Sequence, residues 1–157
     1  MTTGWDAHTL LEQAPDAIIF ADREGLVRYW NPAAERVFGH KAADVLGGGL
    51  YVIIPEQFRE AHDRGFERAL TERKTKYVGQ ALATRARHAN GEDFYVELSF
   101  SIVLDADGNA VGALAHARDI TERFTRDRDA RRHLRAVEQE LAALRADAVT
   151  EAAPGPA

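Results

Sequence analysis

The chain has 157 residues, enough for one domain with a hydrophobic core and an appendage, and its fractions of 45 % apolar and 29 % charged residues are typical of globular proteins. The net charge of −5 argues against a nucleic-acid binder, and no membrane span of roughly 18 apolar residues or secretory signal is present, so we expect a cytoplasmic location. The absence of cysteine excludes disulfides, thiolate metal sites and cysteine–flavin adducts.

The first third of the chain alternates short apolar runs with turn residues. We expect in order a lead-in, a helical turn, two strands of a hairpin and two short helices, at residues 1–8, 9–13, 17–21, 26–30, 33–38 and 42–46. Asn31 followed by Pro32 is typical of the start of a helix, and Gly39 is typical of its end.

The remainder of the domain predicts one helix and three longer strands, at residues 55–72, 76–87, 93–104 and 110–119. The connections between these strands contain Asn90-Gly91 and residues 105–108, both of which are typical of hairpins. Two strands, then short helices, then three strands predict an α+β domain. In such a domain, one antiparallel sheet carries small helices on one face.

The helix expected at residues 55–72 carries a histidine on its apolar side. Steps of three and four residues place Phe58, His62 and Phe66 on one stripe, so the imidazole is predicted to face the interior. The pattern alone leaves two interpretations of this histidine. It can be a core residue bonded to a carbonyl group or to water, or it can be a ligand for a metal or cofactor.

Beyond residue 121 the composition becomes charged, with a regular apolar seam. In the helix expected at residues 122–149, apolar residues recur at steps of four and three, namely Ala130, Leu134, Val137, Leu141, Leu144 and Ala148. An isolated helix of this length is marginal in water, so we expect it to pack against a partner as a coiled coil, unless it folds back on its own domain. Residues 150–157 are expected to be a disordered tail.

Several motifs in a fixed order resemble those of the PAS domain family. They are Ala17–Asp22, Gly25, Tyr29–Glu35, Phe38-Gly39, Leu46-Gly47, Asn90–Glu92, Asp107-Gly108 and Arg118–Arg123. We therefore place a PAS domain at residues 9–121. The resemblance implies a five-stranded antiparallel sheet with short helices and a pocket on one face. It also implies a homodimer and a coiled-coil-like C-terminal helix that passes a signal to a downstream protein.

Within this family, Ile54-Pro55, Arg59 and His62 resemble the haem-binding branch, which includes rhizobial oxygen-sensor kinases and bacterial direct oxygen sensors. In that branch, the histidine on this helix is the proximal ligand of the iron. Gly79 matches a glycine on the next strand of the branch without a gap. The resemblance thus implies haem b with His62 as its metal ligand, in a sensor of a diatomic gas or of redox state.

The same register implies which other residues surround the cofactor. Arg68 and Lys76 occupy positions that meet the haem propionates, and Gln80 occupies the position of a methionine sixth ligand, where it could donate a hydrogen bond to oxygen. Leu82 replaces the distal arginine of the branch, which moves the preference toward carbon monoxide or nitric oxide. The expected cofactor-binding set is His62, Arg68, Lys76, Tyr77, Gln80, Leu82, Leu98, Phe100, Leu114 and Ala115.

Of the other histidines, His8, His40 and His133 are expected to be exposed or nearly so and His88 to be solvated, whereas His116 could line the pocket. His133 lacks the acidic residue and proline of a phosphorylated histidine box, so we expect neither kinase activity nor catalytic residues. Two other functions stay open. One is a PAS module for a flavin or a fatty-acid-like molecule, and the other is a cofactor-free module for dimerisation and protein interaction. We expect no nucleic-acid or membrane partner.

Overall fold

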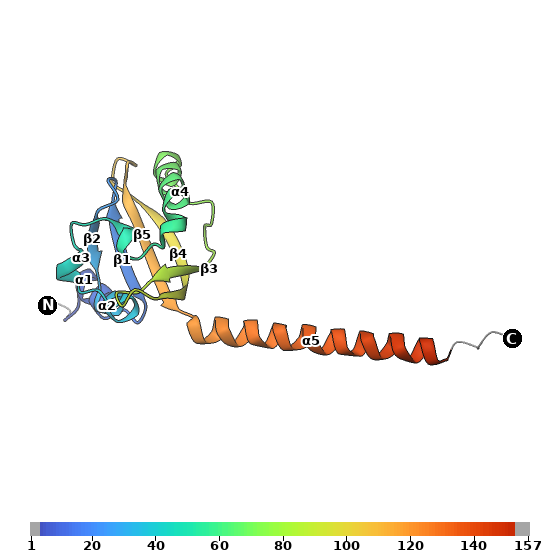
Figure 1. Cartoon of the computed structure of the whole chain (residues 1–157). Coiled ribbons are helices and arrows are strands. Elements are labelled where there is room, and N and C mark those ends of the chain that lie inside the picture. Colours follow the sequence, from blue (N-terminus) through green and yellow to red (C-terminus); the bar gives the residue numbers. More distant parts are fainter. Residues whose placement is uncertain (1–3, 153–157) are drawn as a thin grey trace. The chain divides into compact units, whose positions relative to one another are not determined.

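The computed structural model describes residues 4–152, and the chain divides into two compact units, residues 1–120 and 121–157. The first unit contains five strands and a series of short helices (Figure 1). In chain order they are α1 (Ala7–Glu12), β1 (Ala17–Asp22), β2 (Val27–Trp30), α2 (Pro32–Phe38), α3 (Ala42–Val45), η1 (Leu50–Val52), η2 (Glu56–Phe58), α4 (Arg59–Glu72), β3 (Leu82–Arg87), β4 (Asp93–Leu104) and β5 (Ala110–Asp119).

The five strands form one antiparallel sheet in the order β2-β1-β5-β4-β3, which confirms the expected sheet. The last strand lies at its centre and pairs with the first strand on one side and with β4 on the other. Ala115 of β5 lies opposite both Ile19 of β1 and Phe100 of β4. Since side chains alternate along a strand, this row of residues points to the same face of the sheet.

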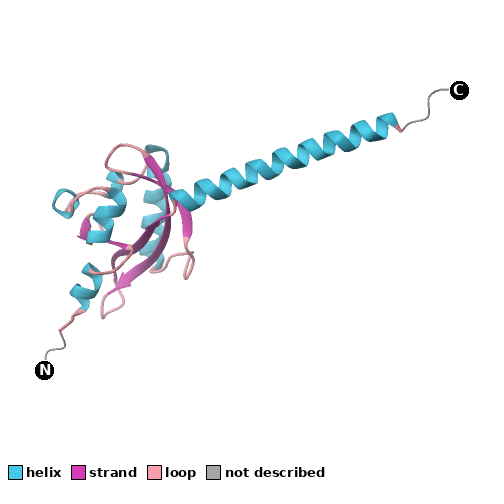
Figure 2. Cartoon of the chain, turned by 90° about the horizontal axis from the view of Figure 1, so that it is seen from below, coloured by secondary structure: helices cyan, strands magenta, loops and turns pink. Residues whose placement is uncertain are grey.

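Helices α2 and α4 lie on that face (Figures 1 and 2). The short helix α2 packs against β1 and β5, and the longer α4 packs against β5 further along the sheet. Helix α2 forms where the sequence predicts it. The Asn31 side chain caps its N-terminus by accepting a hydrogen bond from the Ala34 amide, Pro32 is its first residue, and Gly39 ends it with a φ of 79°.

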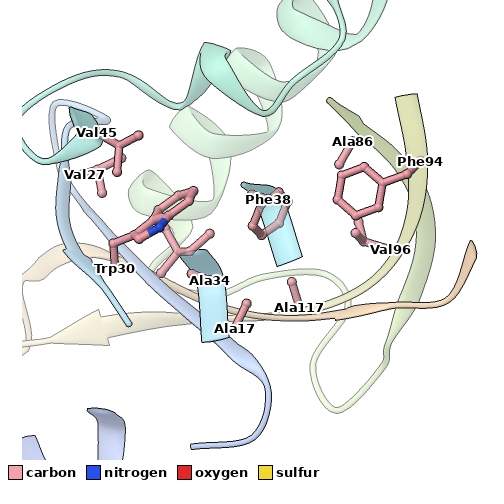
Figure 3. Close-up of a cluster of buried hydrophobic side chains, with 11 residues drawn as sticks. Ala17, Val27, Trp30, Ala34, Phe38, Val45, Ala86, Phe94, Val96 and Ala117 are labelled. Atoms are coloured by element: carbon pink, nitrogen blue, oxygen red, sulfur yellow. The ribbon is translucent and has the colours of Figure 1, made fainter. Parts of the chain in front are cut away.

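A cluster of buried hydrophobic side chains lies between α2 and the sheet (Figure 3). The ring of Phe38 lies between those of Trp30 and Phe94, with centroid distances of 5.5 and 5.7 Å. The Asn31 side chain is fully buried and makes four hydrogen bonds. It accepts from the Ile18 and Ala34 amides, and it donates to the Leu11 and Asp16 carbonyls. One polar side chain thereby joins the ends of α1, β1 and α2.

The structure corrects three expectations about this unit. Strand β3 begins at Leu82 instead of residue 76, because a turn precedes it in which the Gln80 amide donates to the Tyr77 carbonyl and Gly79 has a φ of 70°. The expected helix at residues 55–72 starts as a 3₁₀ turn and becomes α-helical at Arg59. His88 is half-buried instead of exposed, and its ring lies against Gly39 and Phe94.

The second unit is a single helix, α5 (Thr121–Glu151). Its four largest seam residues, Leu134, Val137, Leu141 and Leu144, are exposed on the single chain. Thr150 and Glu151, expected in the disordered tail, continue the helix, and residues 153–157 lie outside the described residues. Within residues 4–152, no helix is both long enough and apolar enough to cross a membrane.

Candidate ligand-binding site

A cavity of about 660 Å³ lies in the first unit, within the range of roughly 300–1,000 Å³ that is usual for small-molecule sites. The sheet contributes an apolar wall that includes Ile19, Val96 and Ile102. Helix α4 and the segment before it form the opposite wall. Their contribution includes Ile53, Ile54, Phe58, Ala61, His62, Gly65, Phe66 and Ala69.

His62 lines this cavity from α4, and 31 % of its side chain is exposed. Its ring stacks on that of Phe66 at a centroid distance of 5.9 Å and an interplanar angle of 19°. The Nδ1 nitrogen lies 3.2 Å from the Oδ1 oxygen of Asp63. A carboxylate at this distance can accept a proton from Nδ1, and in that neutral tautomer the Nε2 nitrogen keeps its lone pair.

Asp63 is held in turn by Tyr51 of η1, whose hydroxyl donates a hydrogen bond to its Oδ2 oxygen. This hydrogen bond raises the pKa of the Tyr51 phenol and, together with the contact to His62, lowers the pKa of the Asp63 carboxyl. Arg59 supports the tyrosine: its guanidinium lies 4.9 Å from the Tyr51 ring centroid and donates to the Tyr51 carbonyl. Arg59 thus holds Tyr51, and Tyr51 holds the Asp63 carboxylate that contacts His62.

Cationic side chains border the same cavity. Arg68 and Lys76 line it as the sequence-based register predicts, and they are joined by Lys74 and Arg85. Lys76 lies 4.9 Å from the Tyr77 ring centroid, and Arg85 lies 5.4 Å from that of Phe58. Among the residues that the structure describes, Arg68, Lys74 and Lys76 form no ion pair, so they remain available for an acidic group on a ligand.

The cavity brings together eight of the ten residues proposed from sequence, namely His62, Arg68, Lys76, Tyr77, Leu82, Leu98, Phe100 and Ala115. Gln80 does not line it, because Gln80 is the last residue of the turn that precedes β3. Leu114 does not line it either, since alternation along β5 sends its side chain to the face opposite Ala115. The exposed His116 shares that outer face and is not among the lining residues.

Sequence reasoning missed Lys74, Arg85 and Thr84 as lining residues, and it missed the contact between Tyr51 and Asp63. Thr84 lies on the same face of β3 as Leu82 and Ala86, so strand alternation from Leu82 would have identified it. Lys74 and Arg85 add two cations that the charge pattern alone does not distinguish from solvated lysines and arginines.

The donor set of the cavity fits haem. Haem needs a flat apolar slot, one protein nitrogen on one side of the iron and cations near its propionates. The aliphatic and aromatic walls, the imidazole of His62 and the cations Arg68 and Lys76 supply the corresponding residue types. Within residues 4–152, no group of three or more His, Cys, Asp or Glu side chains could hold a bare metal ion. A porphyrin, which supplies four nitrogens itself, would make a single histidine sufficient.

A family model described as PAS fold matches residues 11–124. The sensor protein FixL of Bradyrhizobium diazoefficiens is 27 % identical over 114 residues, which cover 73 % of this chain and 22 % of that protein. The oxygen sensor protein DosP of Escherichia coli is 26 % identical over 128 residues, which cover 82 % of this chain and 16 % of that protein. The chain therefore spans less than a quarter of the length of each of these curated relatives.

The fold also matches solved structures. The crystal structure of the PAS domain of a protein from Colwellia psychrerythraea aligns with a TM-score of 0.64 at 22 % sequence identity. The alignment covers 73 % of this chain and 94 % of that chain. At this level of identity the match establishes the arrangement of sheet and helices.

Proposed function

This chain belongs to the PAS family, and we propose that its PAS domain binds haem b through His62 and senses a diatomic gas or a change of redox state. The observation that carries the proposal is the position of His62, which lines an apolar cavity whose border also holds Arg68 and Lys76. The relatives FixL and DosP, named as a sensor protein and an oxygen sensor protein, support a sensory role.

Different residues of the cavity would bind different parts of the haem. His62 would supply the axial nitrogen, and Arg68, Lys74 and Lys76 would pair with the propionates. Haem supplies the iron at which a gas or an electron is received. The aliphatic Leu82 offers no hydrogen bond to such a gas, which favours carbon monoxide or nitric oxide over oxygen. We propose that the chain has no catalytic activity. We also propose that it is located in the cytoplasm.

Reconstitution with haem b tests this proposal. The purified protein is titrated with haem and followed by the Soret absorption band. We expect a saturable band with a shifted maximum in the wild type, and we expect His62→Ala to lose it. His116→Ala is the matched control, since His116 is exposed on the outer face of the sheet, and it should bind haem as the wild type does. Identical spectra for wild type and His62→Ala would refute axial ligation by His62.

A second ligand class is favoured by the same cations. An apolar cavity bordered by Arg68, Lys74 and Lys76 also suits a fatty-acid-like molecule, whose carboxylate would lie among them. Native mass spectrometry of the purified protein distinguishes the two, because it weighs the bound molecule directly. A flavin in the cavity would instead give blue absorption and fluorescence.

We further propose that α5 joins two copies of the chain and passes the signal to a downstream protein. Leu134, Val137, Leu141 and Leu144 recur at heptad spacing and are exposed, as two paired helices require. The experiment is light scattering on a chain truncated after Thr121. We expect a dimeric mass for the full chain and a monomeric mass for the truncated chain. A truncated chain that still has the mass of a dimer would show that α5 does not hold the two copies together.

A further inference from the structure

A series of polar contacts at the rim of the cavity connects His62 to the segment before α4. Asp63 contacts the Nδ1 nitrogen of His62 through its Oδ1 oxygen and accepts the Tyr51 hydroxyl through its Oδ2 oxygen. The two oxygens of one carboxylate therefore serve two partners from different elements. Tyr51 belongs to η1, 12 residues before Asp63, so the chain has to fold before this pair can form.

The tyrosine is itself fixed from two sides. The Arg59 guanidinium lies over its ring, and Nη2 of the same group donates to the Tyr51 carbonyl at 3.3 Å. The Nε nitrogen of Arg59 donates to the Ile54 carbonyl at 3.2 Å. Consecutive residues of a helix do not face each other, so Asp63 needs an outside partner to be held toward His62. Tyr51 is that partner.

We propose that Tyr51 and Asp63 form a positioning pair that keeps the His62 proton on Nδ1 and leaves Nε2 available to a ligand in the cavity. A histidine that binds a metal commonly donates its other ring N–H to a carboxylate, which sets both its tautomer and its orientation. Phe66 restrains the ring by stacking, and Asp63 defines which nitrogen is free. That this ligand is haem iron rests on the proposed function, whereas the tautomer does not.

Nitrogen-15 NMR of the ligand-free protein tests the tautomer. Spectra are recorded at about pH 9, where histidine side chains are generally neutral. We expect the Nδ1–H form of His62 to predominate in the wild type, to lose its predominance in Asp63→Ala, and to be partly restored in Asp63→Asn, which keeps an oxygen acceptor. A predominant Nε2–H form in the wild type, or an unchanged ratio in Asp63→Ala, would overturn the proposal.

Tyr51→Phe tests the second member of the pair. The variant leaves Asp63 in place but removes the hydroxyl that holds it, so we expect a shift of the tautomer ratio in the same direction as in Asp63→Ala and smaller. Tyr29→Phe is the matched control, because the Tyr29 hydroxyl also donates to a carboxylate, that of Glu12 at 2.8 Å, and neither residue lines the cavity. Equal ratios in Tyr51→Phe and Tyr29→Phe would remove Tyr51 from the pair.

Haem affinity links the pair to the proposed function. Loss of a partner behind a metal ligand commonly weakens binding by about 10- to 100-fold, and we expect Asp63→Ala to weaken haem b binding within this range. Glu60→Ala, which removes an exposed carboxylate on the same helix, should leave the affinity unchanged. If the wild type binds no haem, the proposed function fails and the NMR experiment still decides the positioning pair. If haem binds and Asp63→Ala binds it equally well, the positioning role fails alone.

Discussion

Helices α2 and α4 lie over the same face of the sheet and are held there in different ways. The seven residues of α2 include three buried ones, Ala33, Ala34 and Phe38, and both of its ends are capped. The fourteen residues of α4 include no buried one, and its N-cap makes no side-chain hydrogen bond. Helix α2 is fixed by the core, whereas α4 borders the cavity and buries none of its residues, so we expect a ligand in the cavity to act on α4.

Among the substitutions considered for the first unit, removal of the Asn31 side chain, which caps α2, should lower the free energy of unfolding most. Asn31→Ala leaves the Ile18 and Ala34 amides without partners and removes the cap of α2, so we expect a loss of about 3 kcal/mol in the free energy of unfolding. Urea denaturation measures it. Asn31→Asp keeps the acceptor oxygen but turns a buried carboxylate oxygen toward the Leu11 and Asp16 carbonyls, so it should also destabilise the protein. A loss below about 1 kcal/mol for Asn31→Ala would mean that α2 is not fixed in this way.

Replacing a glycine of each helix by alanine should change the free energy of unfolding in opposite directions. Gly39→Ala places a methyl group in a left-handed conformation, 2.5 Å from an atom of the His88 ring, and should cost about 2 kcal/mol. Gly65 lies inside α4 with no atom within 4 Å of an added Cβ, so Gly65→Ala should gain about 0.5–1 kcal/mol through helix propensity.

Thermal unfolding of both variants in the ligand-free protein measures this pair of effects. A destabilised Gly65→Ala would contradict the comparison, since it would mean that the cavity side of α4 is packed as closely as α2.

Local signals explain why α2 could be predicted from sequence and the start of β3 could not. The stretch from Asn31-Pro32 to Gly39 carries its own start and stop signals, and the structure follows them. Residues 76–81 carry strand-like residues, yet Gly79 adopts a positive φ and turns the chain. This turn also explains why Gln80 lies outside the cavity while Leu82 lines it.

The candidate site also contains residues that local signals could place and contacts that they could not. His62 could be placed on the inner side of its helix from spacing alone, and family resemblance supplied Arg68 and Lys76. The contact of Tyr51 with Asp63 depends on how η1 and α4 meet, which no local pattern encodes. On β5, strand alternation distinguishes Ala115 from Leu114, and applying it to both residues would have excluded Leu114 from the cavity.

Acid should weaken the β1–β2 turn, which lies beside the well-packed region. Burial raises the pKa of the Asp22 carboxyl, but hydrogen bonds from Arg28 and from the Leu26 and Glu24 amides outweigh it, and the pKa lies below its usual 3.8. A lowered pKa in the folded state stabilises the protein above about pH 4, and this stabilisation is lost as the pH falls. Asp22→Asn should therefore destabilise the protein at pH 6 and less so at pH 3.

Urea denaturation of wild type and Asp22→Asn at the two pH values measures this effect. We expect it to be smaller than the effects at Asn31 and at the two glycines. A difference between the two proteins that stays constant from pH 6 to pH 3 would show that the carboxylate charge does not contribute.

Hydrogen exchange with and without haem b tests most directly whether the ligand acts through α4. In the ligand-free protein, we predict that the amides of α4 exchange faster than those of α2. Saturating haem should slow the α4 amides toward the rates of α2 in the wild type and leave them fast in His62→Ala. Ligand-free α4 amides as slow as those of α2, or a difference between the helices that haem does not reduce, would contradict this account.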